Sequence, residues 1–270
     1  MLQISSQDNL IIPYHNKIIS KCEACLKNIH PDFLNSNPIV SGSYAINLVY
    51  SPESFHNDID IYFASQNDFD LAKSYIETLY PNSKKFQTEN AISFSIEENK
   101  EVQLICKFFL PPEELIYKHD FIVSSVAISN SKVYTTLETF KAWSKSELSF
   151  RDYQFPESNK DLNKVFIRLF NIINRIDKYS KRYSLDITPS TYQDLKSIYN
   201  LISSNDYLNE SNFIDSPNIQ TPVLDYYGRT VNSKITYKEI ISSLYKFLKE
   251  ENSDSDILPP SFERDNFFTL

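Results

Sequence analysis

The chain has 270 residues, of which 41% are hydrophobic and 14% aromatic. It can therefore bury a core, and we do not expect global disorder. Its formal net charge of -8 argues against a wholly basic nucleic-acid binder, although it does not exclude a local basic groove. No apolar run approaches the roughly 20 residues that span a bilayer, and the N-terminus does not read as a secretory signal, so we expect no membrane partner.

The first elements in chain order are a helix over about 14–29 and a polar loop that contains two prolines. An apolar run then stops at Gly42-Ser43, and one or two helical turns follow. The segment "DIDIYFA", residues 58–64, alternates acid with apolar residues, which predicts a strand. An amphipathic helix over 68–80 follows and is closed by Pro81.

Two strand-like runs, 90–98 and 101–109, are expected to form a hairpin. A helix that starts with proline and acids is predicted over 111–119, and strands are predicted over 120–129 and 132–136. This interleaving of helices and strands predicts an α+β or α/β domain as far as about residue 136.

The remaining segments carry helical spacing, so the C-terminal region is predicted to be mainly helical. The change of character lies between about 136 and 160. We therefore expect an N-terminal domain over 1–140 and a helical domain over 141–270.

The three cysteines are Cys22, Cys25 and Cys106. An odd number in a chain of this size argues against a disulfide framework and fits a reducing, cytoplasmic location. Cys22 and Cys25 form a C-x-x-C pair, but no second pair follows and the four histidines are scattered. We interpret both cysteines as ordinary residues on one face of the first helix.

Gly42 deserves a chemical interpretation because the chain contains only two glycines. A glycine at the end of a strand lets the backbone turn sharply and approach a ligand. If a helix starts there, its free N–H groups face an anion such as a phosphate, and Ser43 can cap the helix or donate to a phosphate oxygen. The alternative for Gly-Ser alone is an ordinary turn.

Asp58 and Asp60 are two residues apart on a predicted strand, so both carboxylates project to the same side. Two such carboxylates repel each other unless a cation lies between them. An oxygen-only, doubly anionic site suits Mg²⁺ or Mn²⁺. Taken alone, the pair could equally face solvent on an edge strand.

Together, Gly42-Ser43 at a strand-to-helix turn and Asp58-Ile59-Asp60 on a following strand resemble the signature of the DNA polymerase beta-like nucleotidyltransferase superfamily. The 14 residues from Tyr44 to Asn57 between the two parts are a little more than is usual. Ser41 precedes Gly42, where the family pattern has an apolar residue.

The resemblance covers roughly residues 35–136 and implies a nucleotidyltransferase-type mixed sheet with flanking helices. It implies that Ser43 and the nearby backbone hold a nucleoside triphosphate, and that Asp58 and Asp60 bind two metal ions, Mg²⁺ or Mn²⁺. A nucleoside monophosphate would then pass to a hydroxyl acceptor, with the metals stabilising the leaving pyrophosphate.

The position of a third acid is open. Active members of the superfamily usually carry one more acid on a neighbouring strand, but the matching position here is Gln103, whose neutral amide cannot balance a second metal. We expect Asp120, at the start of the predicted strand 120–129, to be the third catalytic and metal-binding acid. Glu101 is a weaker candidate because it falls in the predicted hairpin turn.

A basic stripe is predicted on the helix near 160–184, where Arg175, Lys178 and Arg182 continue the spacing of Lys164 and Arg168. The stripe is either a solvated face or a surface that meets triphosphate or an RNA backbone. Because many nucleotidyltransferases append a helical domain that supplies cations to the triphosphate, we take Arg175, Lys178 and Arg182 as candidate nucleotide-binding residues.

The leading functional interpretation is a metal-dependent nucleotidyltransferase whose acceptor is an RNA 3′ end, a protein or a small molecule. The main alternative is a catalytically inactive nucleotidyltransferase-like binding or regulatory protein, which Gln103 keeps open. A purely structural α/β protein would require the pairing of Gly-Ser with Asp-x-Asp to be a coincidence.

Overall fold

The computed structural model of the chain describes residues 15–52, 58–97, 100–151, 162–203, 223–224, 230–232, 237–251 and 257. The chain divides into two compact units, Met1–Tyr153 with Arg182–Asp186 and Gln154–Lys181 with Ile187–Leu270. Among the described residues no helix is long and apolar enough to cross a membrane.

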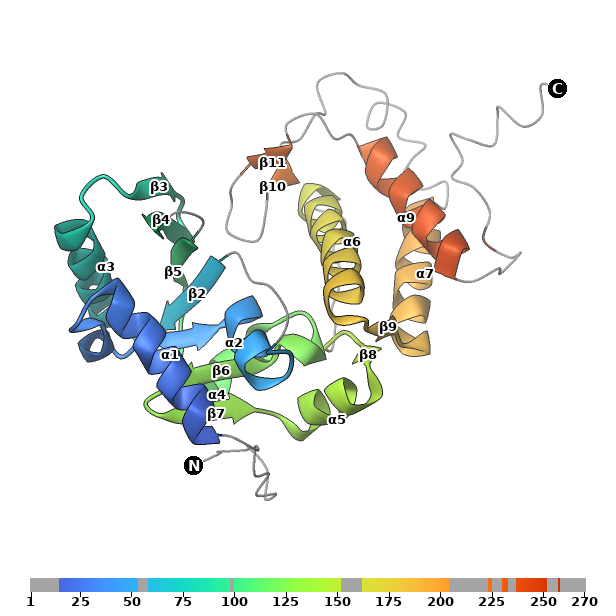
Figure 1. Cartoon of the computed structure of the whole chain (residues 1–270). Helices are drawn as coiled ribbons and strands as arrows, with labels where there is room; N and C mark the ends of the chain where they lie inside the picture. The colour runs from blue at the N-terminus through green and yellow to red at the C-terminus, as the bar shows by residue number, and fades with distance from the viewer. Residues whose placement is uncertain are drawn as a thin grey trace. The chain divides into compact units, whose positions relative to one another are not determined.

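The first unit is built on one seven-stranded sheet with the strand order β3-β4-β5-β2-β1-β6-β7 (Figure 1). Neighbouring strands are antiparallel except β2 and β5, which are parallel, so the sheet is mixed. The strands are β1 Ile39–Ser41, β2 Asp58–Phe63, β3 Lys84–Gln87, β4 Ala91–Glu97, β5 Lys100–Phe109, β6 Val126–Ser129 and β7 Lys132–Thr135.

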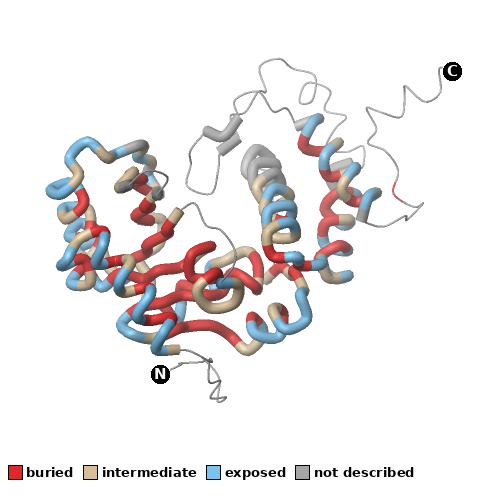
Figure 2. Tube along the Cα trace, viewed as in Figure 1, coloured by how far each residue is buried: buried red, intermediate tan, exposed pale blue. Residues whose placement is uncertain are grey.

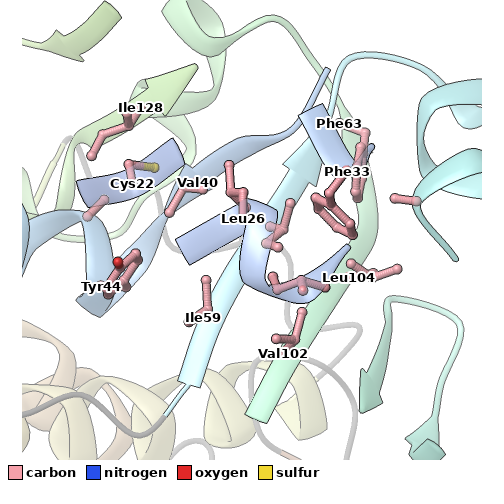
Figure 3. Close-up of a cluster of buried hydrophobic side chains, with 14 of the residues drawn as sticks. Cys22, Leu26, Phe33, Val40, Tyr44, Ile59, Phe63, Val102, Leu104 and Ile128 are labelled. Carbon is pink, nitrogen blue, oxygen red and sulfur yellow. The ribbon is translucent and has the colours of Figure 1, made fainter. Parts of the chain in front are cut away.

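Helices α1 (His15–Ile29) and α3 (Gln66–Leu79) contribute to one hydrophobic core together with one face of this sheet. On β2 the alternation predicted from the sequence holds, since Ile59, Ile61 and Phe63 point into this core. Figure 3 shows Leu26 of α1 lying among strand side chains. Figure 2 shows that the strands are mostly buried, whereas α1 and α3 alternate between buried and exposed residues.

Local signals explain where several elements begin and end. The Ser65 hydroxyl accepts a hydrogen bond from Asp68 N at 3.2 Å and so caps α3, which ends before Pro81. The Thr136 hydroxyl caps α5 (Leu137–Lys145) in the same way.

Cys22 is 2% exposed and lies in the hydrophobic core. Burial raises the pKa of its thiol, which is typical of a structural cysteine.

The strand predicted over 120–129 is wrong in its first half. Strand β6 begins only at Val126, after the short helices α4 (Pro112–Leu115), η2 (Ile116–Lys118) and η3 (Ile122–Ser124). The Ser124 hydroxyl donates to Phe121 O at 3.1 Å, a local bond that competes with strand pairing. Strand β3 and the 3-10 turn η1 (Phe33–Ser36) were not predicted from the sequence.

Residues 182–186 belong to the first unit although they follow most of a helix of the second unit. The Tyr183 hydroxyl donates to Asn47 Oδ1 at 2.9 Å, and its ring packs edge-on against Trp143. Asp186 N donates to Ser146 O at 2.8 Å, next to the short strands β8 (Glu147–Leu148) and β9 (Asp186–Ile187). These contacts connect the segment to α2 (Gly42–Val49) and α5.

The second unit is mainly helical. Its described elements are α6 (Leu162–Tyr183, which ends in the first unit), α7 (Pro189–Ser203), α9 (Tyr237–Glu251), β10 (Val223–Leu224) and β11 (Thr230–Asn232). Helices α7 and α9 pack together, with Tyr199 stacked on Tyr245 at 5.8 Å between ring centroids. A mixed sheet with flanking helices followed by a mainly helical region confirms the predicted fold class.

Candidate nucleotide and metal site

The turn between β1 and α2 (Gly42–Val49) requires glycine for two reasons. Gly42 has φ +71°, a left-handed conformation that L side chains rarely adopt. A Cβ built on Gly42 would lie 2.3 Å from Asp60 Oδ2, closer than real Cβ contacts allow. The backbone at Gly42 therefore lies directly against the side chain of Asp60, the second acid of the Asp-x-Asp pair.

The next residue touches the first acid. Ser43 is 6% exposed, and its hydroxyl donates to Asp58 Oδ1 at 3.3 Å. The residue that precedes the helix, Ser41, makes no side-chain cap with α2. The first-turn amides of α2 therefore have no side-chain acceptor from their N-cap, which is the arrangement that suits an anion. The structure thus brings Gly42, Ser43, Asp58 and Asp60 together.

Asp58 and Asp60 lie on the face of β2 opposite to the hydrophobic core described above. Asp60 is 7% exposed and Asp58 is half-buried. Among the described residues none forms an ion pair with Asp58. A partly buried carboxylate pair of this kind favours binding of a cation.

Ser41 accounts for the departure from the family pattern before Gly42. It is fully buried, and its hydroxyl donates to Val126 O at 2.6 Å. A hydroxyl has one proton, so the 2.8 Å contact between Ser41 Oγ and His119 Nε2 requires the imidazole to donate. His119 therefore carries its proton on Nε2. It contacts β1 at Ser41, the residue that pairs in register with Asp60 of β2.

His119 was missed by sequence reasoning, which treated the four histidines as scattered. It lies 78 residues from Ser41 along the chain, and its ring packs edge-on against Tyr62, on the same face of β2 as the acids. No local pattern could have predicted this pairing.

Glu101 does not lie in a turn, which corrects the expectation from the sequence. It is the second residue of β5 and pairs in register with Asp58, while Gln103 pairs with Asp60. Glu101 Oε1 accepts hydrogen bonds from Ser93 Oγ and, at 2.9 Å, from Gln103 Nε2. Its carboxylate is thus held by two neighbours on β4 and β5.

Asp120 lies outside the sheet, in the half-buried segment before η3. Its backbone carbonyl accepts from Arg151 N at 2.9 Å. Among the described residues no group of three or more His, Cys, Asp or Glu side chains is arranged to hold a metal ion. The role of Asp120 as a third acid therefore stays a prediction.

The three cations predicted to bind nucleotide fall in different units. Arg182 belongs to the first unit with the acids, and its Nη1 is buried without a hydrogen-bond partner among the described atoms. Arg175 and Lys178 belong to the second unit, where Arg175 is half-buried and Lys178 exposed.

The fold is of the nucleotidyltransferase type. A tRNA-processing enzyme, in its apo form I, matches with a TM-score of 0.51 at 14% identity, over 96% of this chain and 64% of that chain. A CCA-adding enzyme in complex with ATP matches with a TM-score of 0.51 at 12% identity, over 87% and 50% of the two chains. A CCA-adding enzyme with CTP matches with a TM-score of 0.50 at 13% identity, over 76% and 50%. At these identities the likeness shows the fold alone.

The chain spans about half to two thirds of the length of these structures. A family model described as "Gabija anti-defense 2 family protein" matches residues 15–146, the part that contains the sheet and its acid pair. No curated protein matches the sequence. The chain is therefore similar to an anti-defence family over residues 15–146, and its fold is similar to those of a tRNA-processing enzyme and CCA-adding enzymes.

Proposed function

We propose that the chain is a metal-dependent nucleotidyltransferase that moves a nucleoside monophosphate from a nucleoside triphosphate to a hydroxyl acceptor. The observation that carries this proposal is the contact of the Gly42-Ser43 turn with the acid pair, through the close approach of Gly42 to Asp60 and the hydrogen bond from Ser43 to Asp58. A turn suited to phosphate and two acids suited to a divalent cation share one corner of the sheet.

Asp58 and Asp60 are the residues that would hold Mg²⁺ or Mn²⁺, because both present carboxylate oxygens on one face of β2. The cation, when bound, supplies positive charge that stabilises the reacting phosphate and the leaving pyrophosphate. Asp120 is kept as the proposed third acid.

The triphosphate would lie at the start of α2. Gly42 lets the backbone approach the phosphates, and the first-turn amides donate to their oxygens. The Ser43 hydroxyl, which donates to Asp58 here, can turn to a phosphate oxygen. Arg182 is the favoured cation for the triphosphate because it shares the compact unit with the acids, and Arg175 and Lys178 are kept as proposed nucleotide-binding residues.

An RNA 3′ end is a natural acceptor for this chemistry, and a protein side chain or a small molecule is the alternative. The structural matches to a tRNA-processing enzyme and to CCA-adding enzymes support nucleotide and RNA as partners. The predicted basic stripe supports a contact with a phosphate backbone. Its described side chains on α6 are those of Arg175, Lys178 and Arg182, whereas those of Lys164 and Arg168 lie outside the described part of the chain.

The test is incubation of the full chain with each labelled nucleoside triphosphate, Mg²⁺ or Mn²⁺, and separate pools of RNA, protein and small molecules. We expect one pool to acquire label with release of pyrophosphate. Asp58→Asn and Asp60→Asn should abolish the transfer, whereas Asp70→Asn, at an exposed position on α3, should not. Full activity in both site variants would remove the mechanism.

A second candidate function is nucleotide binding without transfer, in a regulatory protein. Two observations favour it, the match to an anti-defence family and the presence of Gln103 where an acid was expected. Binding of a nucleoside triphosphate that depends on Asp58 and Asp60, with no pyrophosphate released in any pool, would select this candidate.

A further inference from the structure

Gln103 occupies the centre of a polar row on the site face of the sheet. In register it lies between Ser93 of β4 and Asp60 of β2, and Asp60 in turn pairs with Ser41 of β1. Adjacent strands are about 4.8 Å apart, so the side chains of Gln103 and Asp60 are neighbours. Gln103 is 2% exposed.

The orientation of the Gln103 amide is determined by chemistry. Its Nε2 donates to Glu101 Oε1 at 2.9 Å. An ionised carboxylate only accepts hydrogen bonds, so a flipped amide would place two acceptors against each other. The carbonyl oxygen of Gln103 therefore points away from Glu101.

That carbonyl oxygen, Gln103 Oε1, is buried and has no hydrogen-bond partner among the described atoms. Ser93, its neighbour in register, cannot supply one because the single hydroxyl proton is donated to Glu101. A buried polar atom without a partner costs stability, and such an atom in a native protein calls for an explanation, of which a bound ion is one.

We infer that Gln103 Oε1 is a third protein oxygen for the divalent cation that Asp58 and Asp60 hold, with Glu101 and Ser93 as positioning residues that orient the amide. Amide carbonyls are normal ligands of hard cations. Glu101, in register beside Asp58, accepts hydrogen bonds from Ser93 and Gln103, and the position in register with Asp60 carries the neutral oxygen of Gln103. Gln103 is then a working part of the site and not the remnant of a lost acid.

This inference rests on the proposed metal site and deepens it. The test is Mn²⁺ titration calorimetry on the full chain without nucleotide, combined with thermal melting in EDTA. Gln103→Met keeps the volume and removes both the oxygen and the amide donor to Glu101, so we expect Mn²⁺ affinity to fall about 10-fold or more. The melting temperature in EDTA should change little, because loss of the buried oxygen without a partner offsets loss of that hydrogen bond. Gln193→Met, at an exposed position on α7, is the matched control and should bind Mn²⁺ like the wild type.

Gln103→Glu keeps an oxygen and adds a negative charge beside Asp60. It also removes the amide N–H that donates a hydrogen bond to Glu101. We expect a lower melting temperature in EDTA and tighter Mn²⁺ binding. Equal Mn²⁺ affinity in Gln103→Met and the wild type, with binding abolished in Asp60→Asn, would overturn the inference and leave the metal site standing. Undiminished binding in Asp60→Asn, or no binding by the wild type, would instead defeat the proposed metal-dependent function and this inference with it.

Discussion

The close approach of Gly42 to Asp60 predicts how much Gly42→Ala should lower the free energy of unfolding. An alanine at φ +71° costs about 1–2 kcal/mol from its left-handed backbone conformation alone. Its Cβ would also lie 2.3 Å from Asp60 Oδ2, and Asp60 is buried, so the carboxylate must move against packed neighbours at a further cost of about 1–3 kcal/mol. The sum of the two costs is a large part of the free energy of unfolding of a typical domain, which is about 5–15 kcal/mol.

A double-mutant cycle separates the two effects. In an Asp60→Ala background the carboxylate is gone, so Gly42→Ala should cost only the backbone contribution plus the tight contact with the remaining Cβ. We expect the cost of Gly42→Ala to be about 1–3 kcal/mol smaller in this background than in the wild type.

The assay is urea unfolding followed by far-UV circular dichroism for the four proteins of the cycle, in EDTA so that no cation contributes. Ser146→Gly is a control for the backbone contribution, because Ser146 has φ 56° at the C-terminal end of α5, and it should not destabilise the protein. An equal cost of Gly42→Ala in both backgrounds would refute the steric argument. It would mean that the Asp60 carboxylate does not limit which residue fits at position 42.

Three further predictions address charge, pH and the segment 182–186. Arg182→Gln should weaken nucleoside triphosphate binding about tenfold in equilibrium titrations, since one charge-assisted hydrogen bond is lost, whereas Lys181→Gln, at an exposed residue, should bind normally. Burial raises the pKa of Tyr50 to about 12, above the unfolded value near 10, so the folded state holds this proton more tightly. The free energy of unfolding should therefore fall as the pH rises from about 10 to about 12, and Tyr50→Phe should reduce that fall in urea titrations at several pH values. Tyr183→Phe leaves buried Asn47 without its hydroxyl donor and should lower the free energy of unfolding by about 1–3 kcal/mol, and an unchanged midpoint would show that the segment is not fastened by this bond.

The elements that could be predicted from the sequence are those whose burial leaves a local period. Helix α1 repeats its buried side chains at helical spacing, and β2 alternates Asp58 and Asp60 with core residues. Ser65 and Pro81 mark the ends of α3 through bonds and sterics that act within a few residues. The likeness of Gly42-Ser43 and Asp58-Ile59-Asp60 to a nucleotidyltransferase signature was equally visible, because each part is a short local motif and the two lie close together along the chain.

Tertiary structure alone decided how these pieces meet. The register of β5 against β2 places Gln103 beside Asp60 and Glu101 beside Asp58, and strand pairing across more than 40 residues leaves no trace in local spacing. The same holds for His119 against Ser41, and for Tyr183 against Asn47. The amino-acid sequence determines which side of each element is buried, since that depends on near neighbours, whereas the partner it is buried against depends on the closure of long loops and on packing of the whole sheet.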